Sequence, residues 1–450
     1  MLRRLDAAGA RAELTARVVP DPAVRDAVHQ ILADVRTRGD TAVCEYTERF
    51  DGCRLDTFAV DLADAEAARG AIPGELRAAL DLAAGRIRTY HEGQAGVAVP
   101  PGIDADGITV RELTRPIDRA GLYAPGGRAT YPSSVLMTAI PASVAGVGRT
   151  ALCVPPAADG RIPEVTLAAA AIAGVDEIYR VGGAQAIGAL AYGTETIGRV
   201  DLIVGPGNAY VDAAKREVAG DGTVGIESPA GPSELVVLAD HTAPCDAIAA
   251  DLVAQAEHGP GGRAILVTSQ PDVADAVSDA VGALLDAGDV RDADEVRAAL
   301  EAGGRAVVVR DETEALAVVN EIAPEHLEIV TTEPERLLGS IRNAGAVFLG
   351  PYAATALGDY VAGANHVLPT GGAARFASAL RVDDFLRHLH VVRATEDGVR
   401  GPVGKAAARI ARAEGLDAHA RSIEIRAEED DATVDGPTVD DSTVGGASSR

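Results

Sequence analysis

Several features that point to particular partners are scarce or absent in this 450-residue chain. It has no tryptophan and only 3% aromatic residues, so it lacks the stacking surfaces that bind single-stranded nucleic acids. Its formal net charge of −26 opposes nucleic acid and anionic membranes, because binding to either needs clustered cations. We therefore expect no nucleic-acid and no membrane partner, which leaves small-molecule chemistry as the default expectation.

Signals for disulfides, export and membrane insertion are also missing. The four cysteines form no CxxC pair, a usage that suits reduced thiols in a cytosol. The N-terminal segment MLRRLDAAGARAEL has basic residues but no apolar stretch behind them, and no run of eighteen apolar residues occurs. We expect a soluble cytoplasmic protein that folds without disulfides.

Hydrophobic periodicity divides the chain into helical ends and an alternating middle. Apolar spacing predicts amphipathic helices over residues 21–38 and 75–92. From residue 151, short apolar runs alternate with alanine-rich helical stretches, and a second such series ends at AVFLG. This alternation predicts two tandem α/β units with parallel sheets. The pattern turns helical again beyond Asp383, and the acidic end has too little apolar content to form a core.

Glycine-rich turns offer nucleotide contacts without a complete dinucleotide fingerprint. The segment GVGRTA at 146–151 has the right spacing, but it precedes a strand instead of following one, so we reject it. Gly183 ahead of Gln185, and Gly207 ahead of Asn208, follow strands and open helices, where free amides could face a pyrophosphate. Ordinary α/β turns use glycine in the same way, and Asp201 stands at the wrong end of its strand to bind a ribose. The glycines alone leave nucleotide binding open.

Four of the nine histidines lie near an acid or an amide in the sequence: Gln255 with His258, Glu325 with His326, Asp359 with His366, and Glu414 with His419. Together they indicate a shared polar site for metal ligation and proton transfer. Each pair also has a plainer interpretation. The first is a histidine favoured at a helix C-terminus, the second a solvated connection, the third a surface loop and the fourth a solvated helix face.

The chain resembles the histidinol dehydrogenase family in specific motifs from about residue 20 to 426. These motifs are GLYAPGG, YPSSVLM, VGGAQAI, GPGNAYV, PAGPSE, QAEHGP, PEHLEI, GDYVAGANHVLPT and AEGLDAH. The family oxidises L-histidinol to L-histidine via histidinal with two NAD and one zinc ion, in the final steps of histidine biosynthesis. The resemblance implies an α/β fold with two tandem domains that hold incomplete Rossmann-like parallel sheets, plus small helical N- and C-terminal domains.

The implied division of the chain has five parts. They are an N-terminal helical arm at 1–20, a first α/β domain at 21–122 and 233–380 with the zinc and catalytic residues, a second α/β domain at 123–232 on the NAD side, a C-terminal helical dimerisation domain at 381–430, and a disordered acidic tail at 431–450.

The resemblance also implies roles for single residues. His326 would be the catalytic base and Glu325 would activate water. The implied zinc ligands are Gln255, His258, Asp359 and His419. The implied substrate contacts are Ser233, Gln255, His258, His326, Asp359, His366, Glu414 and His419. The implied NAD contacts are Tyr123, Gln185 and Asn208. In the homodimer that the resemblance implies, Glu414 and His419 would act in trans.

Two alternatives remain beside this interpretation. One is an NAD-dependent dehydrogenase of another amino or sulfo alcohol, against which Glu414 and His419 argue because they would meet the imidazole end of histidinol. The other is a zinc-binding paralogue without turnover, which would be expected to lose Glu325 or His326 first. One departure from the family concerns Thr355, which stands where many members carry a carboxylate and puts a substrate contact in doubt.

Overall fold

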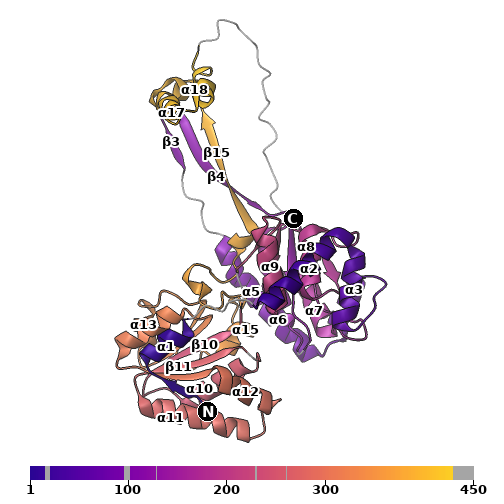
Figure 1. Cartoon of the computed structure of the whole chain (residues 1–450), viewed down its shortest axis with the longest axis vertical. Helices are drawn as coiled ribbons and strands as arrows, with labels where there is room; N and C mark the ends of the chain where they lie inside the picture. The colour runs from indigo at the N-terminus through magenta and orange to yellow at the C-terminus, as the bar shows by residue number, and fades with distance from the viewer. Residues whose placement is uncertain (16–20, 96–101, 128, 229–230, 260, 429–450) are drawn as a thin grey trace. The chain divides into compact units, whose positions relative to one another are not determined.

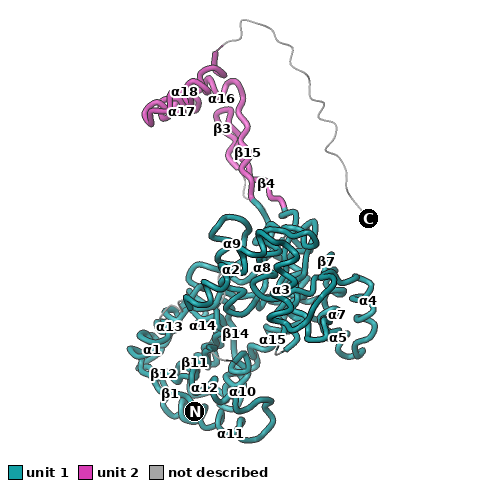
Figure 2. Tube along the Cα trace, turned by 45° about the vertical axis from the view of Figure 1, so that its right-hand side comes forward, with its two compact units in different colours: residues 1–97, 116–387 teal, residues 98–115, 388–450 magenta. Residues whose placement is uncertain are grey.

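The computed structural model of the protein describes residues 1–15, 21–95, 102–127, 129–228, 231–259 and 261–428. They form two compact units (Figure 2). Unit 1 comprises Met1–Val97 and Pro116–Arg387, and unit 2 comprises Ala98–Arg115 and His388–Arg450. The acidic tail predicted at 431–450 lies outside the described residues. Within the described part of the chain, no helix is long and apolar enough to cross a membrane.

Unit 1 contains two six-stranded sheets with the same strand order. The first runs β1 (Arg3–Leu5), β12 (Gly304–Val308), β11 (Arg263–Thr268), β10 (Glu234–Ala239), β13 (His326–Val330) and β14 (Ala346–Leu349), all parallel. The second runs β2 (Ala59–Val60), β7 (Glu177–Tyr179), β6 (Arg149–Cys153), β5 (Arg119–Tyr123), β8 (Leu202–Val204) and β9 (Gly225–Ile226), with only β2 antiparallel.

In each sheet, five strands that follow one another in the chain take the spatial order 3-2-1-4-5, and a short strand is added beside the third. This is the order of a dinucleotide-binding sheet that lacks its sixth strand. The prediction of two incomplete Rossmann-like parallel sheets is therefore confirmed.

Helices cover both faces of the first sheet. Leu235 and Val237 of β10 pack with α10 (Cys245–Ala256), α11 (Pro271–Asp286) and α12 (Ala293–Gly303). Val236 and Leu238 point to the other face, with α1 (Ala7–Leu14), α13 (Glu312–Ile322) and α14 (Pro334–Leu338). Figure 1 shows α10 and α11 on one side of β10 and β11, with α1 and α13 on the other. Because side chains alternate along a strand, burial on both faces explains uninterrupted apolar runs such as ELVVLA.

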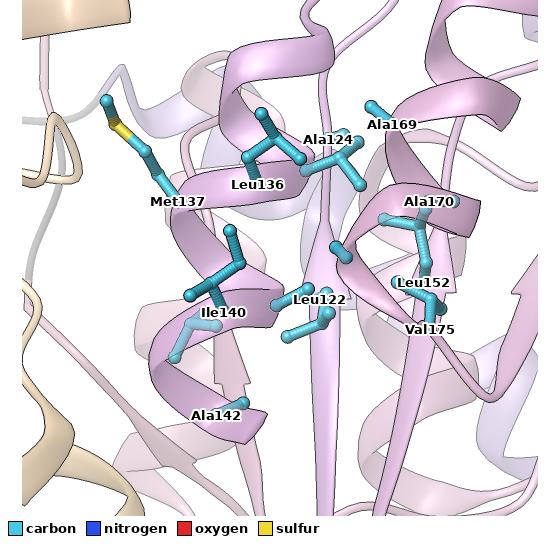
Figure 3. Packing of buried hydrophobic residues seen from close by; sticks show 14 of the residues in the cluster. Leu122, Ala124, Leu136, Met137, Ile140, Ala142, Leu152, Ala169, Ala170 and Val175 are labelled. Carbon is cyan, nitrogen blue, oxygen red and sulfur yellow. The ribbon is translucent and has the colours of Figure 1, made fainter. Parts of the chain in front are cut away.

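The second sheet is covered in the same way. One face carries α2 (Pro22–Arg38), α3 (Asp40–Asp51), α8 (Gly183–Tyr192) and α9 (Ala209–Gly220), and the other carries α4 (Leu62–Ala71), α5 (Gly74–Ala95), α6 (Pro132–Ala145) and α7 (Glu164–Ala173). Figure 3 shows Leu122 and Leu152 of this sheet beside Ile140 of α6 and Ala170 of α7. Helices α2 and α5 confirm the two predicted from periodicity at 21–38 and 75–92.

The chain is divided differently from the expectation in two places. Helices α2 to α5 and strand β5, which lie in the segment 21–122 expected in the first domain, build the second sheet and its helical layers. The expected arm at 1–20 is not separate either, because β1 pairs with β12 and α1 covers the first sheet. Amphipathic spacing determines which face of a helix is buried but not which sheet buries it, so the sequence could not make this assignment.

Unit 2 combines a sheet with helices, which corrects the helical domain expected at 381–430. Its three strands lie in the order β15 (Leu386–Ala394), β4 (Ile108–Pro116) and β3 (Ile103–Ala105). Helices α16 (Glu396–Arg400), α17 (Pro402–Ala413) and α18 (Asp417–Glu424) follow β15. The segment 103–116, distant in sequence, supplies two of the strands, and no local pattern in 381–430 indicates that pairing.

Candidate active site

The residues expected at the catalytic centre lie at the amino-terminal edge of the first sheet. Ser233 directly precedes β10, and His326 begins the neighbouring strand β13. Parallel pairing opposes Leu235 to His326, so the two strand starts meet at one edge. Helix α10 runs back from the end of β10 and brings Gln255 to the same edge, where its Nε2 donates to Ser233 Oγ at 3.1 Å.

A tight, strained turn precedes Glu325 and His326. Ala323 ends α13 with a φ of +54°, a left-handed conformation that costs a non-glycine residue about 1 kcal/mol or more. Pro324 and Glu325 then lead directly into β13. Glu325 and His326 are only 7% and 3% exposed, which excludes the solvated connection that was their plainer interpretation.

Glu325 lies in a buried chain of hydrogen bonds. Its Oε2 accepts from the backbone N–H of Glu234 at 3.0 Å, and its carboxylate also accepts from Ser233. Burial raises the pKa of Glu325, although the nearby His326 opposes that shift. Burial and the charge of Glu325 raise the pKa of Glu234 to about 7. Two buried carboxyl groups this close resist ionising together, so a proton is held near Glu325 at neutral pH.

His326 lies between two carboxylates. Its Nδ1 is 3.3 Å from the carbonyl oxygen of Glu234 and 3.6 Å from Glu325 Oε2, and its Nε2 is 3.5 Å from Asp359 Oδ1. Burial disfavours the charged ring, but Glu325 and Asp359 outweigh burial and raise the pKa of His326 to about 9. Its Nε2 is buried and makes no hydrogen bond of good geometry among the described residues. The ring is therefore an acid/base group aimed at Asp359.

Asp359 and His366 join the two halves of unit 1. Asp359 lies in a short helix, α15 (Thr355–Tyr360), while the chain from Val361 to His366 has no regular structure. Burial raises the pKa of Asp359, but His326, His366 and His258 together lower it below its usual value.

The ring of His366 is fixed at both nitrogens. Its Nδ1 is 3.0 Å from the carbonyl oxygen of Asp359, and its Nε2 is 3.0 Å from Ser134 Oγ on α6. Burial lowers the pKa of His366, which favours the neutral ring. Asn365 beside it donates to the carbonyl oxygen of Met137 at 2.7 Å, also on α6. The segment that follows Asp359 is thus anchored to the helical layer of the second sheet.

The four expected zinc ligands are divided between the two units. Gln255 donates to Ser233, and Asp359 lies 3.5 Å from His326. His258 is close enough to influence the pKa of Asp359 and Glu325. His419 lies on α18 of unit 2, and Glu414 lies in the turn between α17 and α18, so the two are not on the single helix expected. No cluster of three or more His, Cys, Asp or Glu side chains able to hold a metal occurs in the described ranges. The zinc assignment stays a prediction.

A cavity of about 590 Å³ opens at the carboxyl ends of the second sheet. It is lined by Tyr123 at the end of β5, Gln185 on α8 and Asn208 at the start of α9, the three residues expected to contact NAD. Strands β5 and β8 lie side by side there, where the strand order reverses and open α/β sheets bind ligands. Gln185 lines the cavity, and both of its amide atoms are buried without a hydrogen-bond partner among the described residues.

The glycine turns that line this cavity have the predicted placement, and the rejected segment at 146–151 indeed ends α6 and enters β6. Gly205 has a φ of +121°, and a Cβ there would lie 2.0 Å from the carbonyl oxygen of Tyr123. Lys215, buried on α9, donates to the carbonyl oxygen of Gly205 at 3.0 Å and pairs with Glu227 at 2.7 Å. Glu227 in turn accepts from the N–H of Gly205 at 2.8 Å. A buried ion pair therefore fixes the turn that carries Asn208.

Sequence reasoning missed Ser134, Glu234 and Glu328. Glu234 could have been found as a carboxylate at the head of an apolar strand, ELVVLA, and Glu328 as one inside LEIVTT. Glu328 faces Asp251 of α10, and its Oε1 accepts from Thr355 Oγ1 at 2.6 Å and from the Thr355 N–H at 2.9 Å. Thr355 therefore donates two hydrogen bonds to a buried carboxyl group of β13.

The structure defines an α/β protein with a buried cluster of carboxyl and imidazole groups at one sheet and a separate cavity at the carboxyl edge of its second sheet. The family model described as histidinol dehydrogenase matches residues 15–427, and the chain belongs to that family. It is 51% identical to histidinol dehydrogenase of Geobacillus kaustophilus over 90% of this chain and 94% of the relative. It is 48% identical to that of Pseudomonas aeruginosa, over 91% and 92%. The crystal structure of histidinol dehydrogenase from Elizabethkingia anophelis superposes with a TM-score of 0.88 at 34% identity, covering 94% of this chain and 98% of that one.

The Glu328 site predicts how stability depends on pH. Burial and the charge of Asp251 raise the pKa of Glu328 from 4.5 to about 7. Between these values the unfolded chain loses its proton first, so this group stabilises the fold at low pH and that contribution is lost as pH rises toward 7. Glu328→Gln keeps the acceptor for Thr355 and removes the charge. We expect the variant to gain roughly 2 kcal/mol relative to the parent between pH 5 and pH 8.

Urea unfolding of both proteins at the two pH values measures this change, with the exposed Glu335→Gln as the control. Equal pH dependence in the parent and in Glu328→Gln would contradict the buried, protonated carboxyl group.

Proposed function

We propose that the protein oxidises L-histidinol to L-histidine in the cytoplasm through histidinal, with two NAD and one zinc ion per subunit, in the final steps of histidine biosynthesis. The observation that carries the proposal is the buried imidazole of His326 between Glu325 and Asp359. Membership in the histidinol dehydrogenase family supports the choice of substrate. The overall change converts a primary alcohol and water into a carboxylate, two hydrides and three protons.

His326 acts as the base in both oxidations. NAD, when bound, accepts one hydride in each oxidation. An alcohol or a hydrated aldehyde can release that hydride only as it loses an oxygen-bound proton, and His326 takes this proton through Nε2, the atom that lacks a good hydrogen bond. Its Nδ1 faces the carbonyl oxygen of Glu234, which fixes the tautomer that leaves Nε2 free.

Glu325 has a different task. The aldehyde must add water before its second oxidation, and that water loses a proton as it adds to the carbonyl carbon. Glu325 is a base whose pKa is raised by burial, and Ser233 and the backbone of Glu234 hold it in place. Its proton can pass toward Glu234, whose pKa of about 7 suits exchange at neutral pH.

Zinc fits the donors that unit 1 provides. Gln255 and Asp359 offer oxygen atoms and His258 a nitrogen, all at the edge where the catalytic pair lies, and His419 would complete four ligands. Zinc, when bound, would act as a Lewis acid that orients the substrate through the nitrogen atoms of the substrate. A cation held by Asp359 also offsets one of the charges that keep His326 protonated, which favours the neutral base. Ser233, His366 and Glu414 are the further substrate contacts in this proposal.

Assembly as a homodimer completes the proposal, with Glu414 and His419 acting in trans. His419 is exposed on α18. The surface of unit 2 also carries apolar side chains that a monomer would leave in water, since Val392 is 66% and Ile410 60% exposed.

Separate assays of the two oxidations test the roles of the pair. His326→Ala should slow both by about 10²–10⁴-fold, because each needs removal of an oxygen-bound proton. Glu325→Gln should slow histidinal oxidation much more than histidinol oxidation, because only the aldehyde needs added water. The measurement is NADH formation from each substrate, with the exposed Glu335→Gln as the control. Equal damage by Glu325→Gln to both substrates would overturn the division of roles.

Metal analysis tests the zinc site without relying on activity. Protein that is stripped with a chelator and reloaded should bind one zinc ion per subunit. His258→Ala should weaken zinc binding by at least about 100-fold, because loss of a ligand costs more than loss of a group that only orients one. His241→Ala, an exposed histidine beyond the end of β10, is the control. Unchanged zinc content in His258→Ala would remove His258 from the ligand set.

Mixing two inactive variants tests the trans arrangement. His419→Ala and His326→Ala should each be inactive, but random exchange of subunits makes half of the dimers heterodimers, each with one intact site. About a quarter of the native activity should therefore return. Mixing His326→Ala with Glu325→Gln, two changes in the same half-site, should restore none. Failure of the first mixture despite demonstrated exchange would place His419 in its own subunit's site or outside any site.

A further inference from the structure

Sheets that bind dinucleotides usually place an acid against the ribose of the adenosine half, and this chain has none at the usual position. The structure also excludes Asp201 from that role. Its Oδ2 accepts from the N–H groups of Asp118 and Arg119 at 3.1 and 3.0 Å, so it is committed to the start of β5. That start lies at the amino edge of the second sheet, whereas the cavity opens at the carboxyl edge.

A different carboxylate lines the cavity. Asp51 is the last residue of α3 and lies in the wall with Tyr123 and Gln185. Its Oδ2 is buried and has no hydrogen-bond partner among the described residues. Burial raises the pKa of Asp51 to about 6, because no neighbouring charge offsets the loss of water around its carboxylate. An acceptor of this kind, left unmatched in a cavity wall, costs stability unless a ligand supplies a donor.

The chemistry of a dinucleotide limits what Asp51 can face. A carboxylate repels the diphosphate, so Asp51 can face only a neutral hydrogen-bond donor of the dinucleotide. Each ribose offers two such donors on adjacent carbon atoms, its hydroxyl groups. The position of α3 decides which ribose is involved. Helix α3 packs mainly on α2 and α8, which cover one face of the second sheet, whereas α6, whose Ser134 contacts His366, covers the other face. Asp51, at the end of α3, therefore lies on the face opposite His366 and its contact on α6, which favours the adenosine ribose as its partner.

We propose that Asp51 binds the hydroxyl groups of the adenosine ribose and selects NAD over cofactors that carry a 2′-phosphate. This inference depends on the proposed use of the cavity for NAD. A carboxylate accepts hydrogen bonds from the 2′- and 3′-hydroxyls and repels a phosphate at the same position. Arg49, two residues away in the same wall, is a cation that could accept such a phosphate once the carboxylate is neutralised. The selecting acid thus comes from a helix more than a hundred residues before its usual place in the sequence.

Asp51→Asn tests this selection, because it keeps the shape of the side chain and removes its charge. The ratio of kcat/KM with NAD to kcat/KM with NADP should fall by about tenfold to hundredfold, through a higher KM for NAD and better use of NADP. The effect should appear mainly in KM for the two cofactors, because the proposed contact of Asp51 is to the adenosine half of the cofactor. Asp56→Asn, which changes an exposed acid just beyond α3, is the matched control and should leave the ratio unchanged.

Binding of a modified cofactor gives a second test that uses the unaltered protein. Calorimetry should show that NAD lacking the adenosine 2′-hydroxyl binds the parent about tenfold more weakly than NAD, whereas Asp51→Asn should bind the two with similar affinity. An unchanged cofactor ratio in soluble Asp51→Asn, or equal binding of both cofactors to the parent, would overturn the role of Asp51. Neither result affects the proposed function, which fails instead if the parent forms no NADH from histidinol.

Discussion

Parallel pairing of β10 with β13 is the constraint on which the candidate site depends. The register that opposes Leu235 to His326 brings Ser233, Glu234, Glu325 and His326 to one edge, although about ninety residues separate the two strands. Once these side chains meet, their burial and their mutual charges shift their pKa values. The pKa values of Glu325 and Glu234 rise because both lose water, and that of His326 rises because two carboxylates remain close to it.

The two sheets share a topology, but the candidate sites lie at opposite edges of them. The second sheet follows the usual rule of open α/β sheets, since its cavity lies at the carboxyl ends of the strands beside the point where the order reverses. In the first sheet the buried polar side chains gather at the amino edge, because they come from strand starts and from the end of a returning helix. The segment after Asp359 connects the two halves, because His366 and Asn365 bond to Ser134 and Met137 of α6. The proposed function therefore draws its acid/base groups and its cofactor cavity from different sheets.

Buried polar groups hold both parts of the site. Lys215 and Glu227 stabilise the turn that carries Asn208, and removal of either partner would leave an unpaired charge in an apolar layer. Thr355 and Asp251 surround Glu328 in a comparable way behind β13. Thr355 adds no third acid to this pair, which is compatible with a buried, protonated Glu328. Both arrangements fix the backbone that carries residues of the candidate site.

Much of the protein could be inferred from the sequence alone. Strand and helix periodicity indicated two parallel sheets, because alternation and 3.6-residue spacing are local properties of the chain. The histidine pairs and the glycine turns were recognisable for the same reason, as residue types at short spacing. Tertiary structure decided which sheet buries α2 to α5, that β3 and β4 pair with β15, and that Asp51 reaches the cavity of Gln185. These facts depend on contacts between distant segments and on desolvation after they pack, and neither quantity exists until the chain is folded.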